Sequence, residues 1–231
     1  MKIAILDLTK HPEPLMTGLQ RAGASILDWL APSFEGAEFK IFDIAEGNDP
    51  VPTPEAFDGL IVSGSELGVY DAVPWMPSVR DLLIDTKLTG KPIFGICFGH
   101  QIMADVFGGK AKKTNSGNVV GVREYIDENG YRFSAYAWHQ DQVTVLPPEA
   151  TVIAKAQYCP MAGLRYNFPA YSVQYHPEFT KSSISSLLDR GRNHFLDAKT
   201  ADEALQDIAL NRVSNTLDRD KVTVFFQDYG R

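Results

Sequence analysis

A cysteine lies at the centre of the most distinctive stretch of the chain, which reads G-I-C-F-G over residues 95–99. The apolar run Pro92–Ile96 has strand character and leads into it, and a helix-compatible pattern over residues 102–107 follows. This strand, turn and helix predict a nucleophile elbow, in which glycine avoids side-chain clashes on either side of the nucleophile. The N-terminus of the helix points at Cys97 and favours its thiolate. On its own, the motif also fits a cysteine that is merely buried.

A histidine and a glutamate two residues apart offer the partners that a cysteine nucleophile needs. His176 and Glu178 lie in the run Q-Y-H-P-E-F over residues 174–179, which ends a predicted strand. Residues two apart in an extended chain face the same way, and Pro177 stiffens the spacing between them. A thiol needs a base to take its proton, and the base needs a partner that fixes its tautomer. We therefore expect Cys97, His176 and Glu178 to act together as a triad.

A glycine at the end of another strand completes the chemistry of acyl transfer. The run Ser63-Gly64-Ser65 closes the predicted strand Gly59–Ser63. The tetrahedral intermediate of acyl transfer needs two hydrogen-bond donors for its oxyanion. The backbone N–H of Phe98, directly after the nucleophile, and that of Gly64 are the natural pair. An ordinary glycine turn is the alternative for Gly64.

The elements that must position these residues alternate between strands and helices. Apolar runs predict buried strands, and apolar residues at helical spacing predict amphipathic helices between them. The alternation predicts a doubly wound, mainly parallel sheet flanked by helices, with the active site at the carboxyl ends of the strands. In chain order, we expect strand 3–8, helix 14–30, strand 38–44, strand 59–63, helix 76–88 and strand 92–96.

Beyond Gly109 the pattern changes to short strands separated by Gly, Pro, Asn and Asp, which predict added strands, several of them antiparallel. A helix is expected over 182–195, with Phe195 on its inner face, and another over 201–213. The apolar run Val222–Phe226 fits a late edge strand or a tail docked on the body. No linker or repeat divides the chain, which predicts a single domain over residues 1–231. The short strands are expected at 119–126, 131–138, 151–156, 164–166 and 171–175.

Composition restricts the class of protein. The chain has 231 residues, 44% of them hydrophobic, and a formal net charge of −7. These values favour a globular protein and argue against nucleic acid or a membrane as partner. No Cys/His spacing suggests a metal site. Cys97 and Cys159 could pair in a disulfide, but nothing resembles a disulfide framework, a signal peptide or a transmembrane segment, so we expect a reduced, cytoplasmic protein.

Four motifs together resemble the class I (triad) glutamine amidotransferase family. They are G-I-C-F-G-H-Q at 95–101, Q-Y-H-P-E-F at 174–179, W-H-Q-D-Q-V at 138–143 and F-G-G-K at 107–110. The resemblance implies a flavodoxin-like fold, with Cys97 as nucleophile, His176 as base and Glu178 as the partner that orients the base. It implies that Gln101 holds the glutamine-like part of the substrate. It also implies substrate contacts by Ser65, His139, Gln140 and Asp141, although His139 equally fits a polar turn between strands.

The resemblance implies cleavage of a γ-glutamyl amide through a γ-glutamyl thioester, with release of glutamate and of ammonia or an amine, and without a metal or organic cofactor. Ser63-Gly64-Ser65 stands where many synthetase-linked relatives have Gly-Gly-Pro. The loop is instead similar to a stand-alone branch that includes γ-glutamyl peptidases. Two substrates stay open: free glutamine, with ammonia passed to a separate synthetase, and a γ-glutamyl peptide with no partner. A catalytically idle binding module is the third alternative.

Three smaller expectations concern residues near the motifs. Glu66 or Asp71 would meet the α-ammonium group of the substrate, because this acidic loop lies beside a pocket for a zwitterion. His100, which follows the elbow, would pack beneath the nucleophile and not serve as a second base. The helical spacing of apolar residues in the segment 197–231 favours core packing over an interaction surface.

Overall fold

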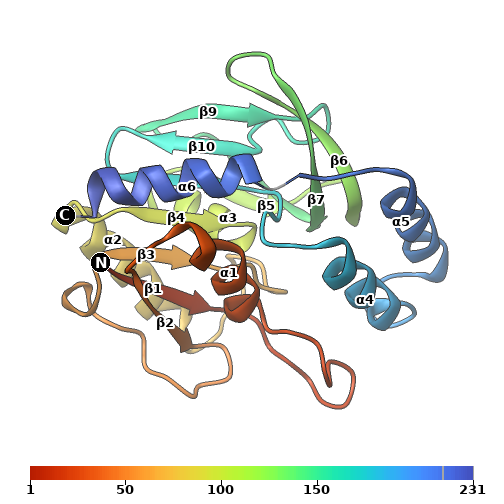
Figure 1. The fold of residues 1–231 in the computed structure, drawn as a ribbon, viewed down its shortest axis with the longest axis horizontal. Coiled ribbons are helices and arrows are strands. Elements are labelled where there is room, and N and C mark those ends of the chain that lie inside the picture. Colours follow the sequence, from red (N-terminus) through yellow and green to blue (C-terminus); the bar gives the residue numbers. More distant parts are fainter. Residues whose placement is uncertain (215, 231) are drawn as a thin grey trace.

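The computed structural model describes residues 1–214 and 216–230, and a nine-stranded sheet in the order β2-β1-β3-β4-β11-β10-β9-β6-β7 forms its centre (Figure 1). The first five strands of this order run parallel to one another, and the pairings from β11 onward are antiparallel. The parallel strands are β1 (Lys2–Asp7), β2 (Glu38–Asp43), β3 (Gly59–Val62), β4 (Ile93–Ile96) and β11 (Ala170–Val173). The others are β10 (Gly163–Tyr166), β9 (Ala150–Lys155), β6 (Val119–Asp127) and β7 (Arg132–His139).

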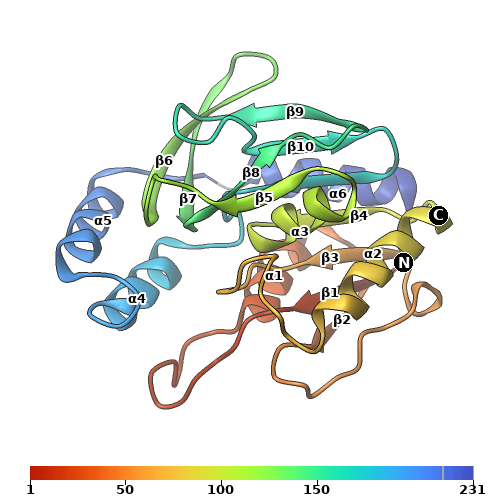
Figure 2. The ribbon, with the colours of Figure 1, turned by 180° about the vertical axis from the view of Figure 1, so that it is seen from behind.

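Helices cover both faces of the parallel strands. The helices α1 (Ala22–Leu30) and α6 (Thr216–Tyr229) lie on one face, and α2 (Met76–Thr89) and α3 (Phe98–Val106) lie on the other, as the two opposite views show (Figures 1 and 2). The predicted doubly wound, mainly parallel sheet with added antiparallel strands is confirmed. Two single-turn helices, Ala31–Ser33 and Pro54–Ala56, lie in connections.

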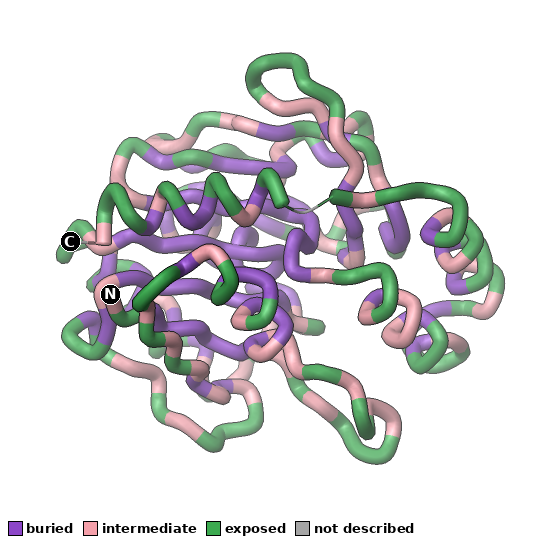
Figure 3. The backbone as a smooth tube through the Cα atoms, viewed as in Figure 1, coloured by how far each residue is buried: buried purple, intermediate pink, exposed green. Residues whose placement is uncertain are grey.

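The central strands β3, β4 and β11 are buried along their whole length, as parallel strands covered on both faces should be. Successive side chains of β1 enter different cores: Ile5 packs with Ile26 of α1 and Phe226 of α6, whereas Leu6 packs on the side of α2 and α3. Figure 3 shows these central strands as buried, in purple, through the middle of the molecule. The sheet is therefore a rigid support for whatever its carboxyl edge carries.

Two further helices lie to one side, on the side toward which β1, β3 and β4 point (Figure 1). The helix α4 (Lys181–Gly191) packs on α5 (Ala198–Leu210), and α5 packs on β6. Arg190 of α4 also donates to the carbonyl oxygen of Leu15, at 3.0 Å, which ties α4 to the loop that follows β1. The carboxyl edge of the sheet is thus flanked by segments from both ends of the chain.

Three sequence expectations are corrected by the structure, and one feature was missed. The first helix begins only at Ala22, because Gly18 adopts a positive φ of 78° that ends any regular helix there. The run Val222–Phe226 is helical within α6 and docked on the sheet, so the edge strand is wrong and the docked tail is right. The helix α4 ends at Gly191, which leaves Phe195 54% exposed. A small second sheet was missed, formed by β5 (Lys110–Lys113) and β8 (Asp141–Val145).

None of the helices in the described part of the chain has both the length and the apolarity that crossing a membrane requires.

Candidate active site

The turn between β4 and α3 is a strained elbow with Cys97 at its tip. Cys97 has φ of 52° and ψ of −101°, a conformation that residues with a side chain rarely adopt. The glycines on either side are sterically required, because a Cβ on Gly95 would lie 2.7 Å from the backbone of Gly99 and a Cβ on Gly99 would lie 2.2 Å from the carbonyl oxygen of Val62. The backbone N–H of Cys97 donates to the carbonyl oxygen of Val173 at 2.8 Å, which fixes the elbow to β11.

His176 and Glu178 follow β11, the strand that lies beside β4. The ring Nδ1 of His176 donates to Oε1 of Glu178 at 2.7 Å, and both side chains are buried. The backbone N–H of His176 donates to the carbonyl oxygen of Tyr136 in β7 at 2.8 Å, and the ring of Phe179 stacks on the imidazole at 4.2 Å. The histidine is therefore held in one tautomer and one orientation, with Nε2 left for another partner.

Opposing influences act on the pKa of His176. Burial lowers it, but the charges of Glu178 and Cys97 outweigh burial and raise the pKa well above its ordinary value. The Nε2 atom is buried and has no hydrogen-bond partner among the described residues, and Cys97 is close enough to act on the imidazole electrostatically. The imidazole is thus prepared to hold a proton beside the sulfur, which a base for a thiol must do.

Gly64 lies next to both reacting side chains. A Cβ placed on Gly64 would be 3.2 Å from Cε1 of His176 and 3.7 Å from Cβ of Cys97. The hydroxyl of Ser63 accepts from the N–H of Leu8 at 2.9 Å and donates to the carbonyl oxygen of Gly64 at 2.8 Å, which holds this turn in place. Phe98 is the first residue of α3, so its N–H has no acceptor within the helix. Gly64 and the N-terminus of α3 are therefore both adjacent to Cys97.

A glutamine to which the sequence analysis assigned no role reaches the cysteine. Nε2 of Gln174 donates to Sγ of Cys97 at 3.6 Å, and the side chain of Gln174 is fully buried. Gln101, also buried, donates from Nε2 to Oε1 of Gln174 at 3.2 Å and to the carbonyl oxygen of Asp141 at 2.9 Å. Gln101 thus lies behind the sulfur in a hydrogen-bonded chain. The signal for Gln174 was present, since it lies two residues before His176 and faces the same way.

The segment from His139 to Asp141 joins β7 to β8 close to the elbow. His139 is buried, its Nδ1 donates to the carbonyl oxygen of Asp141 at 3.0 Å, and burial lowers its pKa to about 3. Burial raises the pKa of the Asp141 carboxyl, against a hydrogen bond from Tyr70, and its buried Oδ2 has no hydrogen-bond partner within the described residues. Gln140 is exposed, and its carbonyl oxygen accepts from the N–H of Thr114 at 3.3 Å.

The loop after Gly64 carries the other expected polar residues. Ser65 is partly buried, and its hydroxyl accepts from the N–H of Leu67 at 3.3 Å. Glu66 accepts from the N–H of Lys10 at 3.3 Å, and Asp71 accepts from the N–H of Gly68 at 2.9 Å. Both carboxylates are therefore engaged in holding loops, whereas the Asp141 carboxylate keeps a buried oxygen without a partner.

His100, near the elbow, is a packing residue. The ring of His100 lies between the hydroxyl of Ser172, at 2.8 Å, and the carbonyl oxygen of Met161, at 3.0 Å, and burial lowers its pKa to about 4. Its predicted place beneath the nucleophile is confirmed.

Cys97 and Cys159 are both free, so the alternative of a disulfide is wrong.

No group of three or more His, Cys, Asp or Glu side chains that could hold a metal ion occurs among residues 1–214 and 216–230. The chemistry available at the elbow is that of a thiol, an imidazole, a carboxylate and backbone N–H groups.

Comparison with known proteins gives consistent results. A family model described as glutamine amidotransferase class-I matches residues 22–191. The chain is 27% identical over 186 residues to gamma-glutamyl peptidase 3 of Arabidopsis thaliana, which covers 74% of this chain and 75% of that protein. It is 43% identical over 95 residues to a glutamine-hydrolyzing GMP synthase subunit of Methanothrix thermoacetophila, which covers 38% of this chain and 52% of that protein.

Solved structures of the same fold are also found. The crystal structure of a glutamine amidotransferase from Thermotoga maritima matches with a TM-score of 0.76 and 17% identity, and covers 100% of this chain and 98% of that chain. The structure of a glutamine amidotransferase from Methylobacillus flagellatus matches with a TM-score of 0.74 and 17% identity over 99% of this chain and 92% of that chain.

Proposed function

The chain belongs to the class I glutamine amidotransferase family, and on that premise we propose that it hydrolyses a γ-glutamyl amide bond through a thioester on Cys97. The observation that carries the proposal is the 2.7 Å hydrogen bond from His176 to Glu178 beside a strained elbow cysteine. A buried imidazole that is oriented by a carboxylate and adjacent to a thiol has the arrangement of a nucleophile with its base.

In the first half-reaction, the sulfur of Cys97 forms a bond to the amide carbonyl carbon, and its proton passes to Nε2 of His176. The carbonyl oxygen becomes an oxyanion, which accepts hydrogen bonds from the backbone N–H groups of Gly64 and Phe98. The carbon–nitrogen bond then breaks as His176 gives its proton to the departing nitrogen. Ammonia or an amine leaves, and the γ-glutamyl group stays on the sulfur.

In the second half-reaction, water attacks the thioester carbonyl carbon and its proton passes to His176. The same two N–H groups hold the oxyanion, and the bond from carbon to Sγ of Cys97 breaks as the sulfur recovers its proton. Glutamate is released. Glu178 keeps its charge throughout and stabilises the imidazolium that forms in each half.

The substrate is held at its amino-acid end by the segment beside the elbow. Asp141 presents a buried carboxylate oxygen without a partner among the described residues, which suits the α-ammonium group of a glutamyl substrate. Glu66 and Asp71 are less suited, because each already accepts a backbone N–H. Ser65 lies on the loop after Gly64, His139 and Gln140 directly precede Asp141 where β7 meets β8, and Gln101 donates to the carbonyl oxygen of Asp141.

Glutamate release by the purified protein tests the proposal. Free glutamine and a γ-glutamyl dipeptide are supplied in parallel, with Cys97→Ala as control. Release that depends on Cys97 supports the proposal, whichever substrate is used. Release from neither, by a folded protein, contradicts it.

Which of the two substrates is turned over distinguishes a γ-glutamyl peptidase from a glutaminase. Turnover of the dipeptide alone identifies a self-sufficient γ-glutamyl peptidase, a form supported by the similarity to gamma-glutamyl peptidase 3 over three quarters of that protein. Turnover of glutamine identifies a glutaminase whose ammonia serves a separate synthetase, a form supported by the similarity to the archaeal GMP synthase component. In the second case, a co-purified synthetase should raise the rate of glutamine hydrolysis, and no such rise would exclude a coupled partner.

A further inference from the structure

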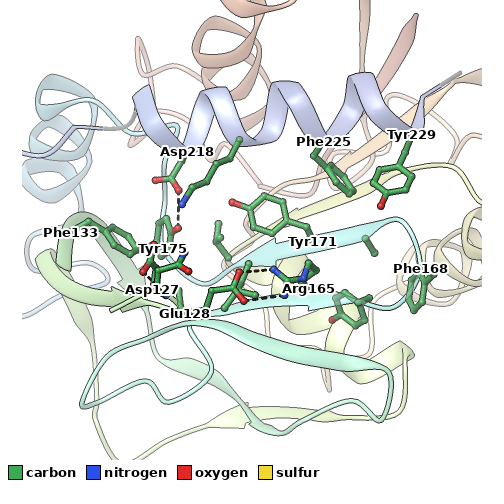
Figure 4. A pocket seen from close by; sticks show the side chains of 17 residues that line it. Asp127, Glu128, Phe133, Arg165, Phe168, Tyr171, Tyr175, Asp218, Phe225 and Tyr229 are labelled. Atoms are coloured by element: carbon green, nitrogen blue, oxygen red, sulfur yellow. Dashed lines mark hydrogen bonds and ion pairs between the residues drawn. The ribbon is translucent and has the colours of Figure 1, made fainter. Parts of the chain in front are cut away.

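A cavity of about 330 Å³ lies between α6 and the strands β9, β10 and β11 (Figure 4). The residues that line it include none of the triad. The volume falls within the range of small-molecule sites, which begins at roughly 300 Å³. The cavity is therefore large enough to hold a small organic molecule.

The two ends of this cavity differ in chemistry, as Figure 4 shows. One end presents the rings of Phe225 and Tyr229, and the ring of Tyr171 lies between the two ends. The other end is polar and carries Asp218, to which the hydroxyl of Tyr175 donates at 3.0 Å. A ligand that fills both ends would have an apolar body and a polar head.

The charged residues at the polar end of the cavity indicate which charge the polar head of a ligand would carry. Glu128 and Arg165 neutralise each other through two hydrogen bonds of 2.6 and 3.0 Å. Asp127 accepts two backbone N–H groups of its own hairpin, each at 2.9 Å. Asp218 is only 8% exposed, and Lys221, an exposed residue that also lines the cavity, acts on it electrostatically.

The Asp218 carboxyl is incompletely compensated. Burial raises its pKa, and the hydrogen bond from Tyr175 and the charge of Lys221 offset burial only in part. A buried carboxylate in this condition gains from a cation placed beside it, and aromatic faces also attract an organic cation.

We propose that the cavity is a binding site for a small organic ammonium ion with an aromatic or apolar body, separate from the catalytic site. The ammonium group pairs with Asp218, and the body extends from there against Tyr171 toward Phe225. This chemistry differs from that of a glutamyl substrate, whose reactive end must reach Cys97.

The strand β11 connects this cavity to the elbow. Tyr171 and Val173 face the cavity, whereas Ser172 faces the other way and bonds His100 beneath the nucleophile. The alternation continues past the strand, where Tyr175 faces the cavity and Gln174 reaches Cys97. A ligand that fixes one face of this segment restrains the other, so occupancy of the cavity should change the rate of catalysis.

Calorimetric titration with phenethylamine tests the site, and 2-phenylethanol serves as a neutral probe of matched shape. The protein carries Cys97→Ala, so that no binding or turnover depends on the thiol. Phenethylamine should bind with 1:1 stoichiometry and at least about tenfold more tightly than the alcohol, because only the amine pairs with a carboxylate. This comparison of probes needs no change at Asp218.

Two variants of α6 locate the site. Asp218→Asn keeps an acceptor for Tyr175 and should weaken phenethylamine binding about tenfold or more. Asp220→Asn removes the same charge from an exposed residue, whose carboxylate pairs with Arg219, and should leave the affinity unchanged. Equal binding of amine and alcohol, equal loss in both variants, or no saturable binding would overturn the proposal.

Discussion

The two cysteines of this chain are equally buried and differ in what surrounds them. Cys97 and Cys159 are 4% and 0% exposed and belong to the same hydrophobic core. Cys159 lies in a local turn, where its backbone exchanges hydrogen bonds with Ala156, and burial raises the pKa of its thiol to about 12. Cys97 lies at a strained elbow with His176 and Gln174 beside its sulfur. Burial alone therefore makes a cysteine inert, and reactivity requires partners that several strands bring together.

The different surroundings of the two cysteines follow from the order of the strands in the sheet. Cys97 follows β4, and β4 lies between β3 and β11, so the chain segments after all three strands meet at the elbow. Gly64 comes from the first of these neighbours, and Gln174 and His176 come from the second. Cys159 follows β9 and contacts only the residues of its own turn through its backbone. Adjacent ends of parallel strands are the feature that makes one thiol a candidate nucleophile.

The largest expected effect comes from exchanging the two cysteines for alanine one at a time. Cys97→Ala should reduce glutamate release by at least about a thousandfold, because it removes the thiol beside His176. Cys159→Ala should leave the rate within about twofold, and its cost of about 1–2 kcal/mol should appear in the free energy of unfolding. Initial rates and urea denaturation measure both. Comparable losses of rate in the two variants would contradict the claim that only Cys97 acts as the nucleophile.

Alkylation compares the reactivity of the two thiols without a substrate. Iodoacetamide near neutral pH should modify Cys97 at least about a hundredfold faster than Cys159, because the thiolate is the reacting form and the raised pKa of Cys159 keeps that thiol protonated. Peptide mass spectrometry of a time course gives both rates in one sample. Equal rates would mean that His176 does not activate its neighbour.

Loss of the carboxylate behind the histidine should have a smaller effect with a distinct pH dependence. Glu178→Gln should lower kcat by about tenfold to a hundredfold. The Glu178 charge raises the pKa of His176, so its removal lowers that pKa, and the imidazolium that protonates the leaving group persists only to a lower pH. The alkaline limb of the rate profile should therefore move to lower pH. An unmoved limb in an otherwise slower enzyme would assign that limb to another group.

The smallest effect concerns the glutamine beside the sulfur. Gln174→Met keeps the volume and removes the hydrogen bonds to Cys97 and Gln101, and should lower kcat about tenfold with little change in KM. Ser172→Ala is the matched control, since it removes a buried hydrogen bond to His100 on the same face of the chain. It should reduce stability by about 1 kcal/mol and leave kcat within about twofold. If both variants lose activity alike, Gln174 acts only through packing.

Much of the parallel half could be predicted from the sequence, because its buried strands are continuous apolar runs and its turns contain glycine. The elbow, the strand that precedes it and the pairing of His176 with Glu178 all follow from local spacing. The helix α6 could not be assigned in this way. Val222–Phe226 is short and apolar, so its periodicity is ambiguous, and only its contacts with the sheet distinguish a docked helix from an edge strand.

Other features depend on the tertiary structure. The strand β5 is mostly exposed lysine and is recognised only by its pairing with β8. The role of Gln174 depends on the distance to a sulfur that is 77 residues away in the chain. The cavity beneath α6 is lined by residues from four separate stretches of the chain, and among these residues only Tyr175 belongs to a motif that the sequence analysis identified.

The central claim is that Cys97 carries the acyl group, and trapping that group is the most direct test. A γ-glutamyl anilide is mixed with excess enzyme, the reaction is quenched in acid after a short interval, and the peptides are analysed by mass spectrometry. We predict one γ-glutamyl group on the peptide that contains Cys97, lost on longer incubation, and none on the peptide that contains Cys159. Steady release of glutamate with no adduct on Cys97, or an adduct on Cys159, would contradict the account.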